Sequence, residues 1–323
     1  MATSTFGFDT TGREVAKAFA GNVGGRTFLI TGPSAGGVGA VTATSLAVSQ
    51  PAQLILAGRT RSKIEPVLQE INAINPDIRV DFVHLDLGDQ ASIRSAVDAI
   101  NRIAPKIDVL INNAGIMALK EYRTTPEGIE AQFGTNHIGH FLLTKLLLPK
   151  IIAAGKGARI VNVSSNGYLL SGVRFDDHNF NGGNSYNPWL AYAQSKTANI
   201  LFTFGLAERL KDRGILSFAV TPGLVLETKL QADVSQELFA KGIETYKEVY
   251  AGREMPPLEK PKPLAASAST TLVAALDPSL EGKSGAYLQN CQTTDVEPHG
   301  TGGENADRLW ALSERLVGEN FEC

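Results

Sequence analysis

Six short, nearly continuously hydrophobic runs alternate with longer amphipathic stretches between about residues 26 and 221. Such runs are typical of parallel strands buried on both faces, and their alternation with helical patterns indicates a parallel sheet with helices on both sides. Asp89 and the pair Thr125-Pro126 are typical helix starts within this pattern. The sequence therefore predicts an α/β fold with one doubly wound parallel sheet. The predicted strands are 26–31, 53–58, 79–85, 107–112, 158–163 and 215–220, and the predicted helices are 38–50, 61–74, 90–103, 126–152 and 192–213.

The remaining segments are predicted to extend this single domain. Thr11 and Glu14 fit a capping box that opens a short helix ending near Ala20. Residues 264–276 and 303–317 have helical patterns, and 285–289 has the pattern of a last strand. The predicted division is 1–24 as an N-terminal helical extension, 25–223 as the core, 224–263 as a substrate lid, and 264–323 as a C-terminal helix, last strand and tail.

The charge and hydropathy of the chain exclude several classes of partner. The formal net charge is -3 without a long run of either sign, whereas a nucleic-acid partner normally leaves a basic stripe. No apolar stretch approaches the length of a membrane-spanning helix, and residues 1–9 lack the regions of a secretory signal. Only Cys291 and Cys323 are present, which excludes a disulfide framework and favours a reducing compartment. We expect a soluble, cytoplasmic protein without a nucleic-acid partner or a membrane anchor.

The first predicted strand runs directly into the glycine-rich stretch Thr31–Gly39. Glycines at a strand-to-helix turn let the backbone approach a diphosphate, and the helix N-terminus offers free N–H groups to it. A tight turn with spare glycines is the alternative. The position directly after the first strand favours nucleotide binding.

Basic residues follow the second predicted strand, where an adenosine ribose would be recognised. A carboxylate at this position accepts a hydrogen bond from the 2′-hydroxyl, whereas an arginine suits a 2′-phosphate by charge and by its planar array of donors. The chain has Arg59 and Arg61 and no acidic residue here. A solvated arginine pair at a helix start is the alternative. We favour NADP(H) over NAD(H).

Polar residues also follow the third, fourth and fifth predicted strands, at the sheet edge where open α/β folds bind ligands. Asp86 follows the third strand and is equally suited to cap the next helix. The stretch 112–115 (Asn-Asn-Ala-Gly) suits a cofactor ribose or a simple turn. Ser165 ends the fifth strand region, as a turn residue or as a donor to a substrate oxygen.

Tyr192 and Lys196 lie four residues apart in a helical pattern and therefore share one helix face. An ammonium beside a phenol favours the phenolate and is expected to lower its pKa. A tyrosine tuned in this way can exchange a proton with a carbonyl oxygen near neutral pH.

Taken together and in this order, these motifs resemble the short-chain dehydrogenase/reductase family over residues 25–225. Asn136 and the pair Pro222-Gly223 complete the set. The stretches 133–144, 175–177 and 191–199 are similar to the retinol-dehydrogenase-like and WW-domain oxidoreductase-like branch. The resemblance implies a single Rossmann-type domain and nicotinamide-dependent hydride transfer. One residue is inserted relative to the glycine pattern of the family, so Gly36 fits when counting forward and Gly37 when counting back; we choose Gly37.

The resemblance also implies residue roles. Tyr192 would be the proton donor in reduction, Lys196 would lower its pKa and bind the nicotinamide ribose, Ser165 would hold the substrate oxygen, and Asn136 would support a water between Lys196 and solvent. These four are the predicted catalytic residues. The predicted cofactor-binding residues are Thr31, Gly32, Ser34, Gly37, Val38, Gly39, Arg59, Arg61, Asp86, Leu87, Asn112, Asn113, Ala114, Gly115, Tyr192, Lys196, Pro222, Gly223 and Val225.

The predicted function is an NADPH-dependent oxidoreductase, of carbonyl reductase or ketoreductase type, that interconverts an aldehyde or ketone and its alcohol. A narrow-specificity biosynthetic ketoreductase and a non-catalytic NADP(H)-binding sensor are the alternatives. Phe175, Tyr186, Trp189 and the leucine-rich 224–230 favour an apolar or aromatic substrate. No metal is required, and a homodimer is compatible with the family.

Overall fold

The computed structural model describes residues 6–231, 234–257 and 259–323, so the first residues of the predicted N-terminal extension and three lid positions lie outside the described residues. One eight-stranded sheet has the order β3-β2-β1-β4-β5-β6-β7-β8. Neighbouring strands from β3 through β7 pair in parallel, and β8 is antiparallel to β7. The doubly wound α/β prediction is confirmed. The strands are β1 (Thr27–Thr31), β2 (Gln53–Gly58), β3 (Arg79–His84), β4 (Val109–Asn112), β5 (Arg159–Val163), β6 (Leu216–Val220), β7 (Tyr287–Gln289) and β8 (Gln292–Thr294).

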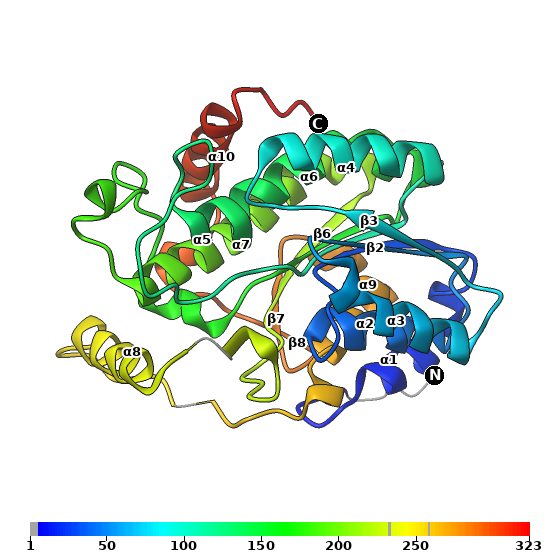
Figure 1. Cartoon of the computed structure of the whole chain (residues 1–323), viewed down its shortest axis with the longest axis horizontal. Coiled ribbons are helices and arrows are strands. Elements are labelled where there is room, and N and C mark those ends of the chain that lie inside the picture. The colour runs from blue at the N-terminus through cyan, green and yellow to red at the C-terminus, as the bar shows by residue number, and fades with distance from the viewer. Residues whose placement is uncertain (1–5, 232–233, 258) are drawn as a thin grey trace.

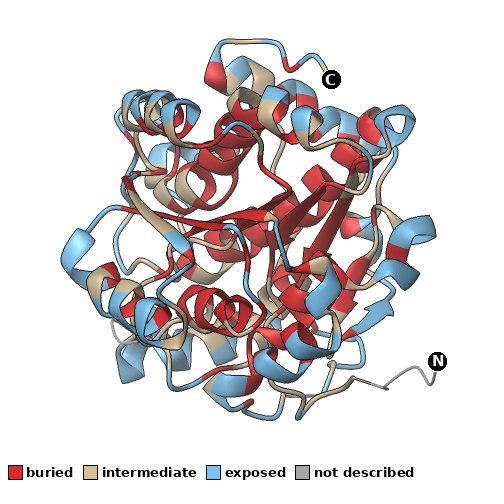
Figure 2. Ribbon diagram, turned by 90° about the vertical axis from the view of Figure 1, so that its right-hand side faces the viewer, coloured by how far each residue is buried: buried red, intermediate tan, exposed pale blue. Residues whose placement is uncertain are grey.

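Two helical layers cover the sheet (Figure 1). One layer contains α4 (Gln90–Ile103), α6 (Gly139–Ala154), α7 (Pro188–Leu210) and α10 (Glu304–Val317), and the other contains α1 (Gly12–Ala18), α2 (Val38–Ala47), α3 (Arg61–Ile74) and α9 (Ser269–Leu276). The strands between the layers are largely buried (Figure 2). The strand order reverses between β1 and β4, because β2 and β3 lie on one side of β1 and the later strands lie on the other. Open α/β sheets bind ligands beside such a point, at the carboxyl ends of the strands.

The last strand, β8, was not predicted. It is three exposed polar residues long and therefore carries no hydrophobic period. Asn290 and Cys291, both with positive φ, form the two-residue connection from β7. Positive φ at both central residues is the geometry of a tight hairpin turn.

Two helices begin at residues other than those predicted. Thr125-Pro126 does not start a helix, because the N–H of Gly128, at φ 78°, donates to the carbonyl of Thr125 and closes a turn. Helix α5 (Ala131–Phe133) begins instead after Glu130 and continues through a π-helical turn, 134–138, into α6.

Helix α7 begins one turn earlier than the predicted residue 192. The side chain of Asn187 accepts hydrogen bonds from the N–H groups of Trp189 and Leu190, and Pro188 occupies the first helical position. An asparagine followed by proline is a recognised start signal. Tyr192 therefore lies inside the helix rather than at its frayed end.

The continuous helical segment Ala131–Ala154 is long and apolar enough to cross a membrane by length and composition, which corrects the expectation that no stretch approaches this length. It is also a core helix, since 61% of its most apolar window is buried in the protein. Its aliphatic side chains pack in the same cluster as those of α4, α7 and α10.

Glu130 is fully buried, and its carboxylate accepts hydrogen bonds from the N–H groups of Gln132 and Phe133 at 2.9 and 2.7 Å. Burial raises the pKa of Glu130 to about 7 from an ordinary value of 4.5, and the two N–H donors oppose this shift. A raised pKa in the folded state gives stability that is complete below pH 4.5 and is lost as pH rises through 7.

We therefore expect the wild type to lose roughly 2 to 3 kcal/mol of unfolding free energy between about pH 5 and pH 8 relative to Glu130→Gln. Urea unfolding at the two pH values measures this difference. Glu127→Gln, at an exposed position, is the matched control and should follow the wild type. Parallel pH dependence in the wild type and Glu130→Gln would show that Glu130 does not titrate in this range.

Candidate functional site

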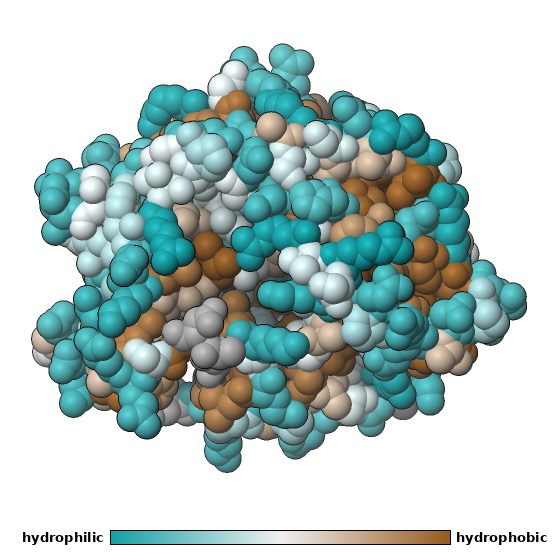
Figure 3. Space-filling view, in the orientation of Figure 1, coloured by the Kyte–Doolittle hydropathy of each residue, from teal (hydrophilic) through white to brown (hydrophobic). Residues whose placement is uncertain are grey.

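A cavity of about 1970 Å³ lies at the carboxyl ends of the parallel strands. Loops after β1, β2, β4, β5 and β6 line it, together with the 224–263 segment. The surface on this side of the molecule is hollowed, with hydrophobic side chains around the hollow (Figure 3). The predicted site residues that line the cavity are Gly32, Ser34, Gly37, Val38, Arg59, Leu87, Asn113, Ala114, Gly115, Ser165, Tyr192, Lys196, Pro222, Gly223 and Val225.

The glycine-rich turn is built by close backbone packing. Gly32 has φ 67°, and a Cβ at this position would lie 2.8 Å from Cα of Ala114. Gly37 precedes α2 as its N-cap and has no side chain to satisfy the first N–H groups of the helix. A Cβ at Gly39 would lie 2.5 Å from the amide nitrogen of Asn113. Gly37 therefore lies at the helix start and lines the cavity. Gly39 packs against Asn113 and does not line the cavity.

Three further predicted cofactor contacts are buried or turned away from the cavity. Thr31 is fully buried, and its hydroxyl oxygen accepts hydrogen bonds from the N–H groups of Asn113 and Ala114. Asn112 donates to Thr144 and Asn162 beneath the cavity floor. The carboxylate of Asp86 accepts from the N–H of Gly88 instead of facing the cavity. None of these three residues lines the cavity, and their cofactor contacts stay predictions.

The structure separates the two arginines that follow β2. Arg59 is exposed and lines the cavity. Arg61 does not line the cavity, pairs with Glu65 at 3.2 Å, and stacks over Phe82, so its cofactor contact stays a prediction. Lys63, which was not predicted, lines the cavity near Arg59. Its place in the first turn of α3, two residues after Arg61, was the available signal.

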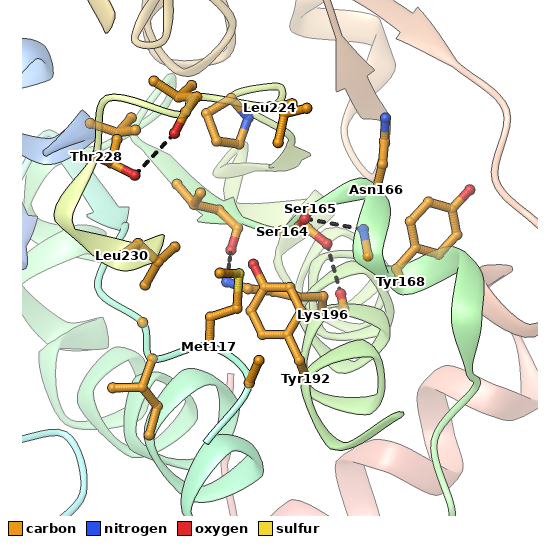
Figure 4. Close-up of a pocket in the computed structure, with 18 of the residues that line it drawn as sticks. Met117, Ser164, Ser165, Asn166, Tyr168, Tyr192, Lys196, Leu224, Thr228 and Leu230 are labelled. Carbon is orange, nitrogen blue, oxygen red and sulfur yellow. Dashed lines mark hydrogen bonds between the residues drawn. The ribbon is translucent and has the colours of Figure 1, made fainter. Parts of the chain in front are cut away.

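Tyr192, Lys196 and Ser165 meet at the cavity wall (Figure 4). The Lys196 ammonium lies 5.6 Å from the centroid of the Tyr192 ring and donates to the carbonyl of Val163 at 3.0 Å. The Ser165 hydroxyl accepts from the N–H of Gly167 at 3.1 Å and lies close enough to the Tyr192 phenol to lower its pKa. Ser164 donates to the carbonyl of Lys196 at 2.8 Å, which holds α7 against the end of β5.

Burial dominates the electrostatics of this pair. It lowers the pKa of Lys196 to about 8, and it raises the pKa of Tyr192 to about 12 against the opposing hydrogen bond from Ser165. The expected lowering of the Tyr192 pKa is therefore wrong for this structure. Burial of the phenol outweighs any stabilisation of the phenolate by Lys196 in this structure.

Asn136 lies in the π-helical turn and is fully buried, so it does not line the cavity. Its amide donates to the carbonyl of Ile116 and the hydroxyl of Ser195, both at 2.9 Å, and accepts from the N–H of Ile116 at 2.8 Å. A Cβ at Gly115 would lie 3.2 Å from the Asn136 carbonyl oxygen and 3.5 Å from the Lys196 ammonium. The side chains of Asn136 and Lys196 therefore both lie beside Gly115, while the support of a water by Asn136 stays a prediction.

Residues 224–263, the predicted lid, contain α8 (Gln236–Val249), a helix that the sequence did not predict. The indole N–H of Trp189 donates to the carbonyl of Leu238 at 2.8 Å, which ties α8 to the start of α7. Large apolar side chains with more than two fifths of their surface exposed also line the cavity, namely Leu230, Phe239, Ile243 and Met255. Of the three aromatic residues expected at the substrate, Trp189 lines the cavity. Phe175 and Tyr186 pack elsewhere, and the Tyr186 hydroxyl donates to the carbonyl of Leu119.

His137 and His140 lie three residues apart in the sequence, and both are held by hydrogen bonds in the protein core. His140 is hydrogen-bonded to the hydroxyl of Thr31 and the carbonyl of Asn136, both at 2.9 Å, and His137 is hydrogen-bonded to Ser313. Burial lowers the pKa of His137 to about 3 and of His140 to about 4. Among the described residues, no group of three His, Cys, Asp or Glu side chains is arranged to hold a metal ion.

Comparison with known proteins agrees with the sequence resemblance. Residues 26–238 match the model of the short chain dehydrogenase family. Retinol dehydrogenase 12 from Bos taurus is 35% identical over 319 residues, which cover 95% of this chain and 93% of the relative. Retinol dehydrogenase 13 from Homo sapiens is 37% identical over 294 residues, which cover 91% of this chain and 85% of the relative. An uncharacterized protein from Mycobacterium paratuberculosis superposes with a TM-score of 0.65 at 31% identity, over 94% of this chain and 98% of that structure.

Proposed function

Because the chain belongs to the short-chain dehydrogenase/reductase family, in its retinol-dehydrogenase-like branch, and is thus an oxidoreductase, we propose that it reduces an aldehyde or ketone with NADPH. The same residues would catalyse the reverse oxidation. The observation that carries the proposal is the convergence of Tyr192, Lys196 and Ser165 on a cavity that also contains a glycine-rich helix start.

The residues around the glycine-rich turn fit a nicotinamide dinucleotide. Gly32 allows close backbone approach, and the uncapped start of α2 after Gly37 suits a diphosphate by charge and by its free N–H groups. Arg59 and Lys63 favour a 2′-phosphate on the adenosine ribose. The lid lysine Lys229 lies above the turn, with its Cε 4.0 Å from where a Cβ at Gly36 would be.

The cofactor, when bound, supplies the hydride, and the protein supplies a proton and two hydrogen-bond donors. With a pKa of about 12, Tyr192 is a neutral phenol at physiological pH and can donate its proton to the carbonyl oxygen. Ser165 donates a second hydrogen bond to the same oxygen as negative charge develops there. Lys196, with a pKa of about 8, holds the positive charge beside that oxygen and can return a proton to Tyr192.

The substrate is proposed to be apolar over most of its length. Leu230, Phe239, Ile243 and Met255 offer a hydrophobic wall on the lid side, and Trp189 and Tyr246 add aromatic surface. Burying this wall against a ligand would be favourable in proportion to the apolar area removed from water.

The proposal is tested by following the loss of NADPH absorbance with a panel of aldehydes and ketones, with NADH in parallel. Turnover with NADPH and weak turnover with NADH is the expected result. A thermal shift with NADPH but no turnover on any carbonyl would contradict a general reductase and favour the narrow-specificity or the nucleotide-sensing alternative.

The titration of Lys196 predicts the pH dependence of reduction. Reduction requires the Lys196 ammonium and the Tyr192 phenol, and the ammonium is the first of the two to lose its proton as pH rises. We expect kcat for reduction to be level below pH 8 and to fall by roughly tenfold per pH unit above it. A profile that stays level to about pH 10 would show that the charge on Lys196 is not needed.

A further inference from the structure

A second polar group lines the cavity, apart from the Tyr192, Lys196 and Ser165 group. Oε1 of Glu259 accepts hydrogen bonds from the amide nitrogens of Asn166 and Gln289, at 2.6 and 3.2 Å. The Tyr287 hydroxyl donates to the carbonyl oxygen of Asn166 at 2.8 Å. All four side chains line the cavity.

The hydrogen bonds of this group run in one direction. Tyr287 donates to Asn166, and Asn166 and Gln289 donate to Glu259, so the network ends on an acceptor. Within residues 6–231, 234–257 and 259–323, no protein donor is hydrogen-bonded to Oε2 of Glu259. A half-buried carboxylate oxygen gains most from a further donor, since burial removes part of its hydration. Burial indeed raises the pKa of Glu259, against hydrogen bonds from Gln289 and Asn166 and the charge of Lys262.

The residues that follow Glu259 are anchored to the loop after β6. Pro261 forms a bridge with Leu224, and the N–H of Lys262 donates to the carbonyl of Leu224 at 2.7 Å. The Lys262 ammonium is almost fully buried and donates to Asn290 at 2.9 Å. These contacts position the Glu259 carboxylate in the wall of the cavity.

The group lies beside the reaction centre. Asn166 directly follows Ser165 in the chain, and in Figure 4 it lies beyond Ser165 on the side away from Met117 and Leu230. Glu259 is also close enough to Tyr192 for its charge to raise the pKa of the phenol. A substrate whose carbonyl oxygen meets Ser165 and Tyr192 would therefore reach Glu259 with another part of the same molecule.

We propose that Glu259, Asn166, Gln289 and Tyr287 form a subsite for a hydroxyl group of the substrate, so that the preferred substrates are hydroxylated aldehydes or ketones. This inference rests on the proposed carbonyl reduction. The substrate hydroxyl donates to Oε2 of Glu259, while its apolar body packs against the lid side chains Leu230 and Phe239. A site built to bind a hydroxyl discriminates strongly against the analogue without it, because its buried polar groups are then left unpaired.

The test compares ω-hydroxyaldehydes with the n-alkanals of matching length, using NADPH. For the wild type we expect kcat/KM to favour the hydroxyaldehyde by at least about tenfold at the best chain length. Glu259→Leu should remove this preference by lowering kcat/KM for the hydroxyaldehyde more than for the alkanal. Glu297→Gln, which changes another cavity-lining carboxylate outside the Asn166 network, is the matched control and should keep the preference.

Three results would overturn the subsite. The first is an equal kcat/KM for hydroxyaldehydes and alkanals in the wild type. The second is a preference for hydroxyaldehydes that is retained in Glu259→Leu. The third is an equal loss of kcat/KM for both series in that variant, which would indicate a structural role. Alkanal turnover in any of these cases would still support the proposed function.

If no aldehyde reacts, the proposed function fails, and calorimetry with alkanediols and alkanols on the NADP⁺-loaded protein tests the subsite alone. Tighter diol binding that is lost in Glu259→Leu supports it, and equal binding overturns it.

Discussion

Replacing Tyr192 with phenylalanine is expected to lower kcat for carbonyl reduction by about 10²- to 10⁴-fold, with NADPH affinity changed by less than about threefold. The ring itself is retained, so its packing is unchanged. A Cβ at Gly167 would lie 2.8 Å from Cε1 of the Tyr192 ring, which shows how closely the backbone covers it. The loss therefore reports the O–H group alone, as proton donor to the substrate oxygen.

Stopped-flow reduction and a thermal shift with NADPH measure the two quantities separately. Tyr246→Phe is the matched control, because Tyr246 also lines the cavity but stacks on Tyr250. It should retain turnover within about threefold. If Tyr192→Phe kept more than about a tenth of wild-type kcat, another group would have to be the acid.

The sequence predicted the sheet well because its strands are buried on both faces. In β1, β2 and β5 every residue is buried, so the hydrophobic run and the strand coincide within a residue. The start of a helix depends on the side chain that caps it. The cap residue that the sequence pattern favours most is not always the one that caps the helix in the structure. Glu130 caps α5 from a fully buried position, whereas glutamate is an uncommon cap in sequence-based rules.

The candidate site was predictable where a motif places its residues on one loop or one helix face. Tyr192 and Lys196 are one helical turn apart, and Ser165 follows the end of β5. The sequence did not predict which strand-end residues face the cavity, so Thr31 and Asn112 were assigned to the cofactor although both are buried in hydrogen bonds beneath it. The pKa of Tyr192 was predicted in the wrong direction because it depends on burial, which spacing does not reveal.

Glu259 shows the limit of motif reasoning. It lies in a proline-rich connector without periodicity, more than 90 residues from Asn166 in sequence. The bridge between Leu224 and Pro261 and the buried Lys262 help to hold its carboxylate at the cavity wall. In such a segment, tertiary packing determines which residues reach the substrate. The fold alone does not identify the substrate.

Arg59→Asp is expected to reverse the cofactor preference, changing the ratio of kcat/KM for NADPH to that for NADH by on the order of 100-fold. Arg59 is the exposed guanidinium that lines the cavity at the end of β2. Replacing it removes charge-assisted hydrogen bonds to a 2′-phosphate, and the new carboxylate repels the phosphate while accepting from the 2′-hydroxyl of NADH. Lys63→Ala should change the ratio in the same direction by a smaller factor.

The second arginine provides the control, because the structure places it outside the cavity. Arg61 pairs with Glu65 and stacks over Phe82, so Arg61→Ala should leave the ratio of the two cofactors unchanged within about twofold. If Arg61→Ala moved the ratio as far as Arg59→Asp, the phosphate would be bound by the helix start as a whole. If the wild type preferred NADH, the assignment of Arg59 would be wrong, while the roles of Tyr192 and Lys196 would be unaffected, since neither contacts the adenosine end of the cavity.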